Sequence, residues 1–219
     1  MTIGKRAVTV LSTATAAAAV VIGLGVAPAM ASTPSLTAKV TGGGSYTATT
    51  PKTVLTDGPV SVTCSSKGKT PASQASGSIP SGTHHGKAPV KVGTAAKLAF
   101  NNCSGPLGKV TTKIESTPYS VSVDSKTNSK GQTDGLISGV KVAVSMTGCA
   151  FTVTGSAPGY YTNGKHTLSM TSKLPIKTST KAQLTVSGVK GCAGIVKNGD
   201  HPSYTGTYTL NRKGTVKVS

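Results

Sequence analysis

The chain has 219 residues, with 23 lysines and arginines against five acidic residues, six tyrosines, two phenylalanines and no tryptophan. This length allows one or two domains. So few aromatic residues argue against a nucleic-acid platform that stacks bases, and five acids are few for a hydrolase with several working carboxylates.

The N-terminal segment has the organisation of a secretory signal peptide. Lys5 and Arg6 form a basic start, and an uncharged run rich in Ala and Val follows over residues 7–26. Ala29-Met30-Ala31 supplies the small residues that precede a cleavage site. We therefore expect cleavage before Ser32. A retained membrane anchor is the alternative.

The predicted signal peptide covers residues 1–31, and the mature chain covers residues 32–219. Two of the 23 basic residues lie in the leader, so the mature chain carries 21 of them against five acids, a net charge of +16. The mature chain contains no further apolar run of membrane length. We expect an exported protein without a transmembrane segment, either extracellular or associated with the cell wall.

The mature chain contains four cysteines, and an even number in an exported protein indicates two disulfides. They are Cys64, Cys103, Cys149 and Cys192. Three pairings are open, and the spacing favours Cys64 with Cys103 and Cys149 with Cys192. No Cys-x-x-Cys or mixed Cys/His spacing typical of a metal site occurs.

Apolar residues alternate with polar ones in short segments along the whole mature chain, which is typical of half-buried strands. The clearest segment is residues 140–146, and no segment has a helical stripe. Other alternating pairs are Val60/Val62, Val121/Val123, Phe151/Val153, Leu168/Met170, Leu184/Val186, Tyr208/Leu210 and Val216/Val218. The sequence predicts an all-β, disulfide-braced, sandwich-like module of about ten to fourteen strands.

Turns and loops are predicted where Gly, Asn, Asp, Ser and Pro gather. Residues 65–89 have almost nothing to bury and are predicted to be a long flexible surface loop. A shorter loop is predicted over residues 125–133. Ser-Gly-Val-Lys occurs at residues 138–141 and again at 187–190, which suggests a repeated hairpin. One compact unit is expected, and a division into two lobes near Lys130 is the alternative.

The turns and cysteines together resemble a known family. The segments that carry the resemblance are Gly42-Gly43-Gly44-Ser45-Tyr46-Thr47, Thr56-Asp57 before a Val-x-Cys strand, Phe100-x-x-Cys103-Ser104-Gly105-Pro106-Leu107-Gly108, Gly148-Cys149, and Gly191-Cys192 with Gly199-Asp200 and Thr207-Tyr208. In these segments the chain resembles small secreted actinobacterial β-rich proteins with four cysteines. The resemblance implies an exported β-rich module and no particular activity.

The acidic residues do not form an evident catalytic pattern. Asp124 and Asp134 could meet across the loop at 125–133, as a glycosidase pair would require. Asp57, Asp134 and Asp200 each adjoin a glycine, so we interpret them as turn residues. No Gly-x-Ser-x-Gly elbow, phosphate loop, dinucleotide fingerprint or His-Glu-x-x-His motif occurs. We predict no catalytic residue, no cofactor and no enzymatic activity.

Two local clusters could bind something. His84-His85 is the one cluster of metal-capable residues, but adjacent histidines point in different directions, and we interpret them as solvated loop residues and predict no metal site. Tyr160-Tyr161 is an aromatic pair beside a predicted turn and could hold a sugar ring or a peptide. The alternative is that one tyrosine faces the core and the other covers the loop.

The basic residues are spread evenly and are almost all lysine. Sequence-specific readers of nucleic acids cluster arginine, so we expect only non-specific, salt-sensitive attraction to polyanions such as cell-wall polymers. A surface that merely confers solubility is the alternative. The sequence thus predicts a non-enzymatic, basic, envelope-associated or extracellular binding or structural module. The competing hypothesis is a secreted inhibitor or antagonist that presents the loop at 65–89.

Overall fold

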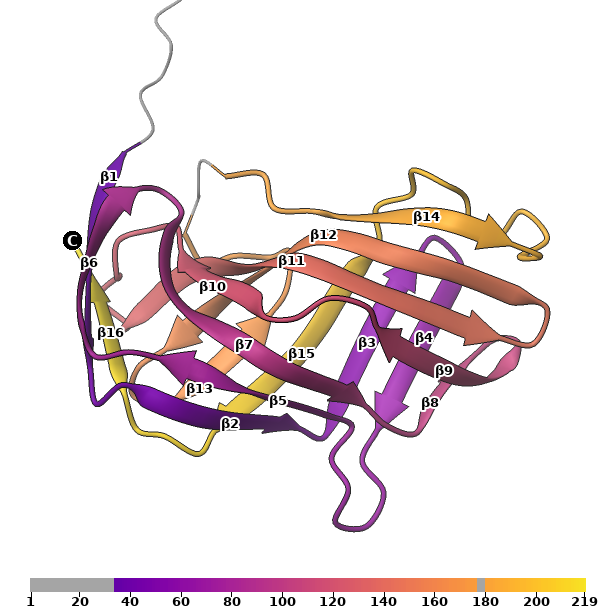
Figure 1. The fold of residues 1–219 in the computed structure, drawn as a ribbon, viewed down its shortest axis with the longest axis horizontal. Coiled ribbons are helices and arrows are strands. Elements are labelled where there is room, and N and C mark those ends of the chain that lie inside the picture. Colours follow the sequence, from indigo (N-terminus) through magenta and orange to yellow (C-terminus); the bar gives the residue numbers. More distant parts are fainter. Residues whose placement is uncertain (1–33, 177–179) are drawn as a thin grey trace, which may run out of the picture. The chain divides into compact units, whose positions relative to one another are not determined.

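The computed structural model describes residues 34–176 and 180–219, and this part of the chain folds into antiparallel β-sheets (Figure 1). The all-β fold class is confirmed. The signal peptide predicted over residues 1–31 lies outside the described residues. No helix that could cross a membrane is found in the described part of the chain.

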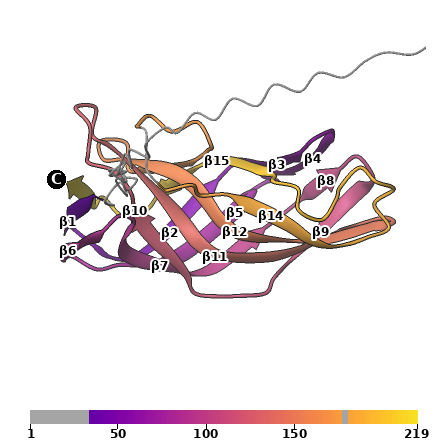
Figure 2. The same cartoon turned by 90° about the horizontal axis from the view of Figure 1, so that it is seen from above.

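Three strands form a small sheet in the order β16–β1–β6. They are β1 (Ser35–Thr41), β6 (Gly82–Lys87) and β16 (Thr215–Val218). Leu36, Ala38 and Val40 alternate with polar residues in β1, so one face of this sheet is apolar and buried. Both views place the small sheet at one end of the large one (Figures 1 and 2).

Thirteen strands form the large sheet, in the order β14–β12–β13–β15–β2–β5–β7–β10–β11–β9–β8–β4–β3. In chain order they are β2 (Gly44–Thr50), β3 (Lys52–Asp57), β4 (Val60–Ser65), β5 (Ser73–Ile79), β7 (Val90–Phe100), β8 (Cys103–Gly105), β9 (Gly108–Ile114), β10 (Tyr119–Val123), β11 (Gln132–Met146), β12 (Cys149–Thr162), β13 (Thr167–Met170), β14 (Leu184–Lys190) and β15 (Ser203–Leu210).

Two additional pairings, β12 with β11 and β15 with β3, close the large sheet on itself. One consequence is a closed ring of eight antiparallel strands in the order β10–β11–β12–β13–β15–β2–β5–β7. The long strands β11 and β12 extend beyond this ring, where β9 and β14 pair with them. Closed antiparallel rings of eight strands have an interior just wide enough for side chains or for one small ligand.

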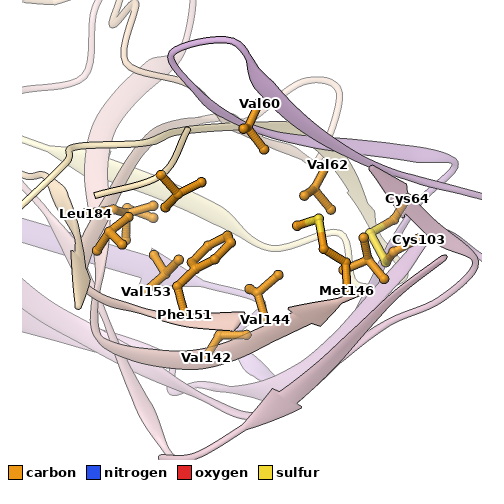
Figure 3. Close-up of a cluster of buried hydrophobic side chains, with 14 of the residues drawn as sticks. Val60, Val62, Cys64, Cys103, Val142, Val144, Met146, Phe151, Val153 and Leu184 are labelled. Carbon is orange, nitrogen blue, oxygen red and sulfur yellow. A yellow bond between two sulfur atoms is a disulfide. The ribbon is translucent and has the colours of Figure 1, made fainter. Parts of the chain in front are cut away.

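Buried apolar side chains form two clusters. The large cluster contains Val62, Val144, Met146, Phe151 and Val186 among others, and Figure 3 shows its side chains converging between the strands. The small cluster lies between the small sheet and strands β7 and β10, and it contains Leu36, Val40, Val90, Val123 and Val216. Each cluster draws on both halves of the sequence, so the clusters do not follow a division of the chain near Lys130.

The structure contains two disulfides, with the pairing that the spacing favoured. Cys64 of β4 lies directly opposite Cys103 of β8 and is bonded to it. Cys149 opens β12 and is bonded to Cys192, which follows β14. All four residues belong to the large cluster, so the bridges brace the same core.

The repeated Ser-Gly-Val-Lys segment is a repeated bulge, and the predicted hairpin is wrong. In β11 the pairing register with β12 shifts between Ser138 and Val140, and in β14 residues 187–190 lie beside a similar shift in β12. Gly139 and Gly188 both have positive φ, of 80° and 62°. A glycine in this conformation is typical of one bulge class, so the same four residues bend the strand on each side of β12.

The predicted long loop over residues 65–89 is also wrong, because β5 and β6 occupy most of it. β5 is poor in apolar residues, but its backbone pairs with β2 and β7 on both sides. At Gly77 a Cβ atom would lie 2.0 Å from the carbonyl oxygen of Thr94, so glycine permits this close pairing. The exposed hairpin at residues 66–70 remains outside the strands.

Candidate functional site: an apolar cavity in the closed ring

An apolar cavity of about 190 Å³ lies inside the ring of eight strands and is also lined by residues of other strands, among them Val40 of β1 and Val62 of β4. Every strand of the ring contributes to its wall, and the wall is made almost entirely of aliphatic and aromatic side chains. Among the described residues, Arg212 is the one charged side chain in this lining. An apolar void of about 150 Å³ is known to stay dry and to bind benzene, so this cavity has room for a slightly larger group.

Small residues at inward-facing positions leave this space open. Ala48 of β2, Ala95 of β7 and Ala157 of β12 line the cavity and are 2%, 3% and 6% exposed. Protein interiors are normally packed with few voids larger than a water molecule. Three alanines from three different strands facing one space therefore produce a cavity that a core of leucines would fill.

Two hydroxyl groups in the wall, those of Tyr204 and Tyr208, are hydrogen-bonded within the protein, whereas the buried hydroxyl of Tyr119 has no hydrogen-bond partner among the described residues. The hydroxyl of Tyr208 donates to Oγ of Ser73 over 2.8 Å and is also hydrogen-bonded to the hydroxyl of Tyr204. Burial raises the pKa of Tyr208, and burial together with the neighbouring Tyr208 raises the pKa of Tyr204 well above the usual value. These hydroxyls stay neutral and internally bonded, so they need no polar ligand.

The cavity reaches the surface between two turns. Of all its lining residues, Gly42 and Arg212 are the exposed ones. Gly42 belongs to the turn between β1 and β2, and Arg212 belongs to the turn between β15 and β16. Nε of Arg212 donates to the carbonyl oxygen of Gly42 over 2.7 Å. We call this place, formed by Gly42–Gly44, Arg212 and Gly214, the mouth.

Tyr160 and Tyr161 lie in β12 and not at a turn, and both contribute to the cavity wall. Adjacent strand residues point to opposite faces of a sheet. Tyr161 packs against the small cluster, and its hydroxyl donates to the carbonyl oxygen of Gly214 at the mouth over 2.7 Å. Tyr160 lies opposite Asp134 in β11. The two side chains therefore point to opposite faces of β12.

The adjacent residues His84 and His85 contact different partners. His84 and His85 are in strand β6, which corrects the prediction of a loop. Nδ1 of His85 is 3.0 Å from the hydroxyl of Thr37, whereas Nε2 of His84 is 3.4 Å from the carbonyl oxygen of Pro80. Within residues 34–176 and 180–219 no group of three metal-capable side chains is found.

Four of the five acids come together in two pairs. Asp134 lies inside β11 and is fully buried, so its interpretation as a turn residue is wrong. Its Oδ2 accepts a hydrogen bond from the backbone of Ile176, while Asp124 accepts one from Thr180. Burial, and secondarily Asp124, raises the pKa of Asp134 to about 6. Both carboxyl groups are buried.

The second pair is Asp57 and Asp200. Burial raises the pKa of Asp57, and the carboxyl group of Asp200 raises it further. Asp200 closes a turn by accepting a hydrogen bond from the backbone of Lys197 over 2.7 Å, which matches its interpretation as a turn residue. Among the described residues, Oδ2 of Asp57 has no hydrogen-bond partner.

No family model, curated protein or solved structure matches this chain. The resemblance to small secreted actinobacterial proteins stays a prediction.

Sequence reasoning missed the cavity and its mouth. Arg212 was visible only as the single arginine after the leader, and Gly42–Gly44 only as a turn. The two are separated by 170 positions in the sequence, and no local pattern joins them. The alternation of apolar residues showed which side chains face inward, but not that their combined volume leaves a space.

Proposed function

We propose that this protein is a non-enzymatic, exported binding module that holds one small apolar ligand inside its closed ring of strands. The observation that carries the proposal is the cavity of about 190 Å³ with its aliphatic and aromatic wall. An empty apolar cavity lowers the stability of the fold in proportion to its volume. A ligand that fills the cavity would restore these lost contacts. Pockets that bind small molecules are mostly apolar and largely preformed.

Benzene tests this proposal directly. At ten times its dissociation constant, a ligand that binds only the folded state stabilises it by about 1.4 kcal/mol, which corresponds to a rise in Tm of about 3–5 °C for a domain of this size. We expect such a rise for the wild-type protein, measured by thermal unfolding in sealed cells. Absence of any rise up to the solubility limit of benzene would contradict the proposal.

A filled cavity should remove the effect of benzene. Ala157→Leu places three further carbon atoms in the space, so we expect benzene binding to weaken at least tenfold while the fold is retained. The matched control is Ala143→Leu in β11. Ala143 lies between Val142 and Val144, which face the large cluster, and so points to the opposite face. Equal loss in both variants would contradict a site inside the ring.

The charge distribution favours a second role, which is retention on anionic cell-wall polymers. Among the described residues, Lys141 with Glu115 is the one ion pair, with Nζ and Oε2 3.5 Å apart. The remaining acids are paired with each other or bonded to backbone and hydroxyl groups, so most of the positive charge is uncompensated. Such a surface attracts polyanions without recognising a sequence.

A salt wash of the producing cells tests retention. We expect the protein to stay with the wall at low ionic strength and to be released between about 50 and 200 mM salt, because screening and counterion effects weaken such binding steeply over this range. The amounts in medium, salt wash and wall are compared by intact mass. Recovery from the medium alone would show that the charge confers only solubility.

A further inference from the structure

The mouth of the cavity has a single charged group. The guanidinium group of Arg212 is exposed and belongs to the cavity lining, and only its Nε is engaged, with the carbonyl oxygen of Gly42. Among the described residues, no acceptor lies within hydrogen-bond distance of its two terminal nitrogens, and no carboxylate lies within 4.0 Å of them. A guanidinium group in this state offers a fork of N–H donors to an incoming anion.

The turn at Gly42–Gly44 leaves room for the guanidinium group of Arg212 at the mouth. A Cβ atom on Gly44 would lie 2.9 Å from the guanidinium carbon of Arg212, and a Cβ atom on Gly43 would lie 2.3 Å from the carbonyl oxygen of Ile79. Gly42 and Gly44 also have positive φ, of 65° and 135°. Three glycines in sequence therefore give the mouth a rim of bare backbone over which the arginine can lie.

Two further hydrogen bonds fix the turn that carries Arg212. The side chain of Asn211 accepts a hydrogen bond from the backbone of Thr47 over 2.8 Å, which ties the turn after β15 to β2. The hydroxyl of Tyr161 binds the carbonyl oxygen of Gly214 in the same turn. The charged group is thus carried by a turn that is fixed to two strands of the ring.

We propose that the ligand is a monocarboxylate with an apolar tail, whose tail fills the cavity while its carboxylate pairs with Arg212 at the mouth. This inference rests on the proposed function. The cavity volume limits the tail to roughly six to eight carbons, since a void of about 150 Å³ holds the six carbons of benzene. The apolar wall accounts for affinity, and the single arginine accounts for the preference for an anion.

A comparison of octanoate with 1-octanol separates the contribution of the carboxylate to affinity from that of the apolar tail. Binding of each to the wild-type protein is measured by isothermal titration calorimetry at low ionic strength. We expect octanoate to bind roughly tenfold or more tightly than octanol, because a charge-assisted, two-pronged hydrogen bond is available only to the carboxylate. Equal affinities would overturn the inference.

Three variants locate the effect at Arg212. Arg212→Gln should lose roughly tenfold in affinity for octanoate and leave octanol unchanged, while Arg212→Lys should recover part of the loss. Lys213→Gln removes the neighbouring exposed charge and is the matched control, which should change neither affinity more than about twofold. A loss in Lys213→Gln equal to that in Arg212→Gln would overturn the inference in favour of general charge attraction.

The benzene measurement distinguishes the two proposals. If benzene stabilises the protein and octanoate binds no more tightly than octanol, the carboxylate inference fails and the cavity function stands. If neither benzene nor either octyl compound binds, both fail. Arg212 is exposed at a turn, so its substitution leaves the core packing intact.

Discussion

Removing the bridge between Cys149 and Cys192 lowers the free energy of unfolding by about 4 kcal/mol. The two cysteines are separated by 43 positions, and in the loop-entropy model a cross-link across this length restricts the unfolded chain by about that amount. The change is Cys149→Ala with Cys192→Ala, measured by urea unfolding of the mature chain. Since whole domains are stabilised by about 5–15 kcal/mol, the loss is a large share of the total.

The other bridge is the matched control for this prediction. Cys64 and Cys103 are separated by 39 positions, and the model depends only on the logarithm of the loop length. Cys64→Ala with Cys103→Ala should therefore cost nearly the same, about 4 kcal/mol. All four sites are buried in one cluster, so the cavities left by alanine are comparable. Losses that differ by more than about 2 kcal/mol would show that native-state packing, rather than loop closure, dominates.

Stability falls as pH rises from about 4 to above 6, and Asp134 is the main cause. Its pKa is raised to about 6 in the folded protein from an ordinary value of 3.8. Between these values the folded carboxyl group holds its proton while the unfolded one has released it, so the stabilisation is complete below the unfolded pKa and is lost as pH passes the folded one. The free energy of unfolding falls by about 1–3 kcal/mol over this range. The upper figure converts the full pKa shift, and the lower figure allows for solvent screening.

Asp134→Asn should flatten this pH dependence and make the protein more stable at neutral pH. The amide oxygen can still accept the hydrogen bond from Ile176, and the side chain has no charge to bury. Glu115→Gln is the control, because Glu115 pairs with Lys141 at the surface. A smaller slope will remain in Asp134→Asn, since burial and Asp200 also raise the pKa of Asp57. Stability that rises with pH between 4 and 6 in the wild-type protein would contradict this account.

Strands could be predicted from the sequence where apolar side chains alternate with polar ones. In residues 140–146 and in the pair Phe151/Val153, apolar residues recur at every second position, and these residues lie in β11 and β12 with that face buried. The signal fails for β5, whose serines and glycines form a strand because the backbones of β2 and β7 are available on either side. Backbone pairing leaves no mark in residue type, so a segment of this kind looks like a loop.

The acidic residues show that local sequence also fails to predict which carboxyl groups are buried. An Asp beside a glycine indicates a turn when only neighbours in sequence are considered, as at Asp200, which follows Gly199. Asp134 has the same local signature, yet it lies mid-strand and is covered by residues distant in the sequence, among them Ile176. Whether such a carboxyl group keeps its proton depends on that cover, which no pattern within a few residues contains.

The sequence by itself determined the all-β class and the alternation that defines the inward faces, because these depend on residue type at short range. The spacing of the four cysteines favoured the observed disulfide pairing but left all three pairings open. The tertiary structure alone decided the closure of the ring, the cavity and the place of Arg212 at its mouth. Closure depends on pairings such as β15 with β2, which join opposite ends of the chain. The size of an interior space is a difference between the volume enclosed by eight strands and the volume of the side chains that fill it, and only the assembled strands set that difference.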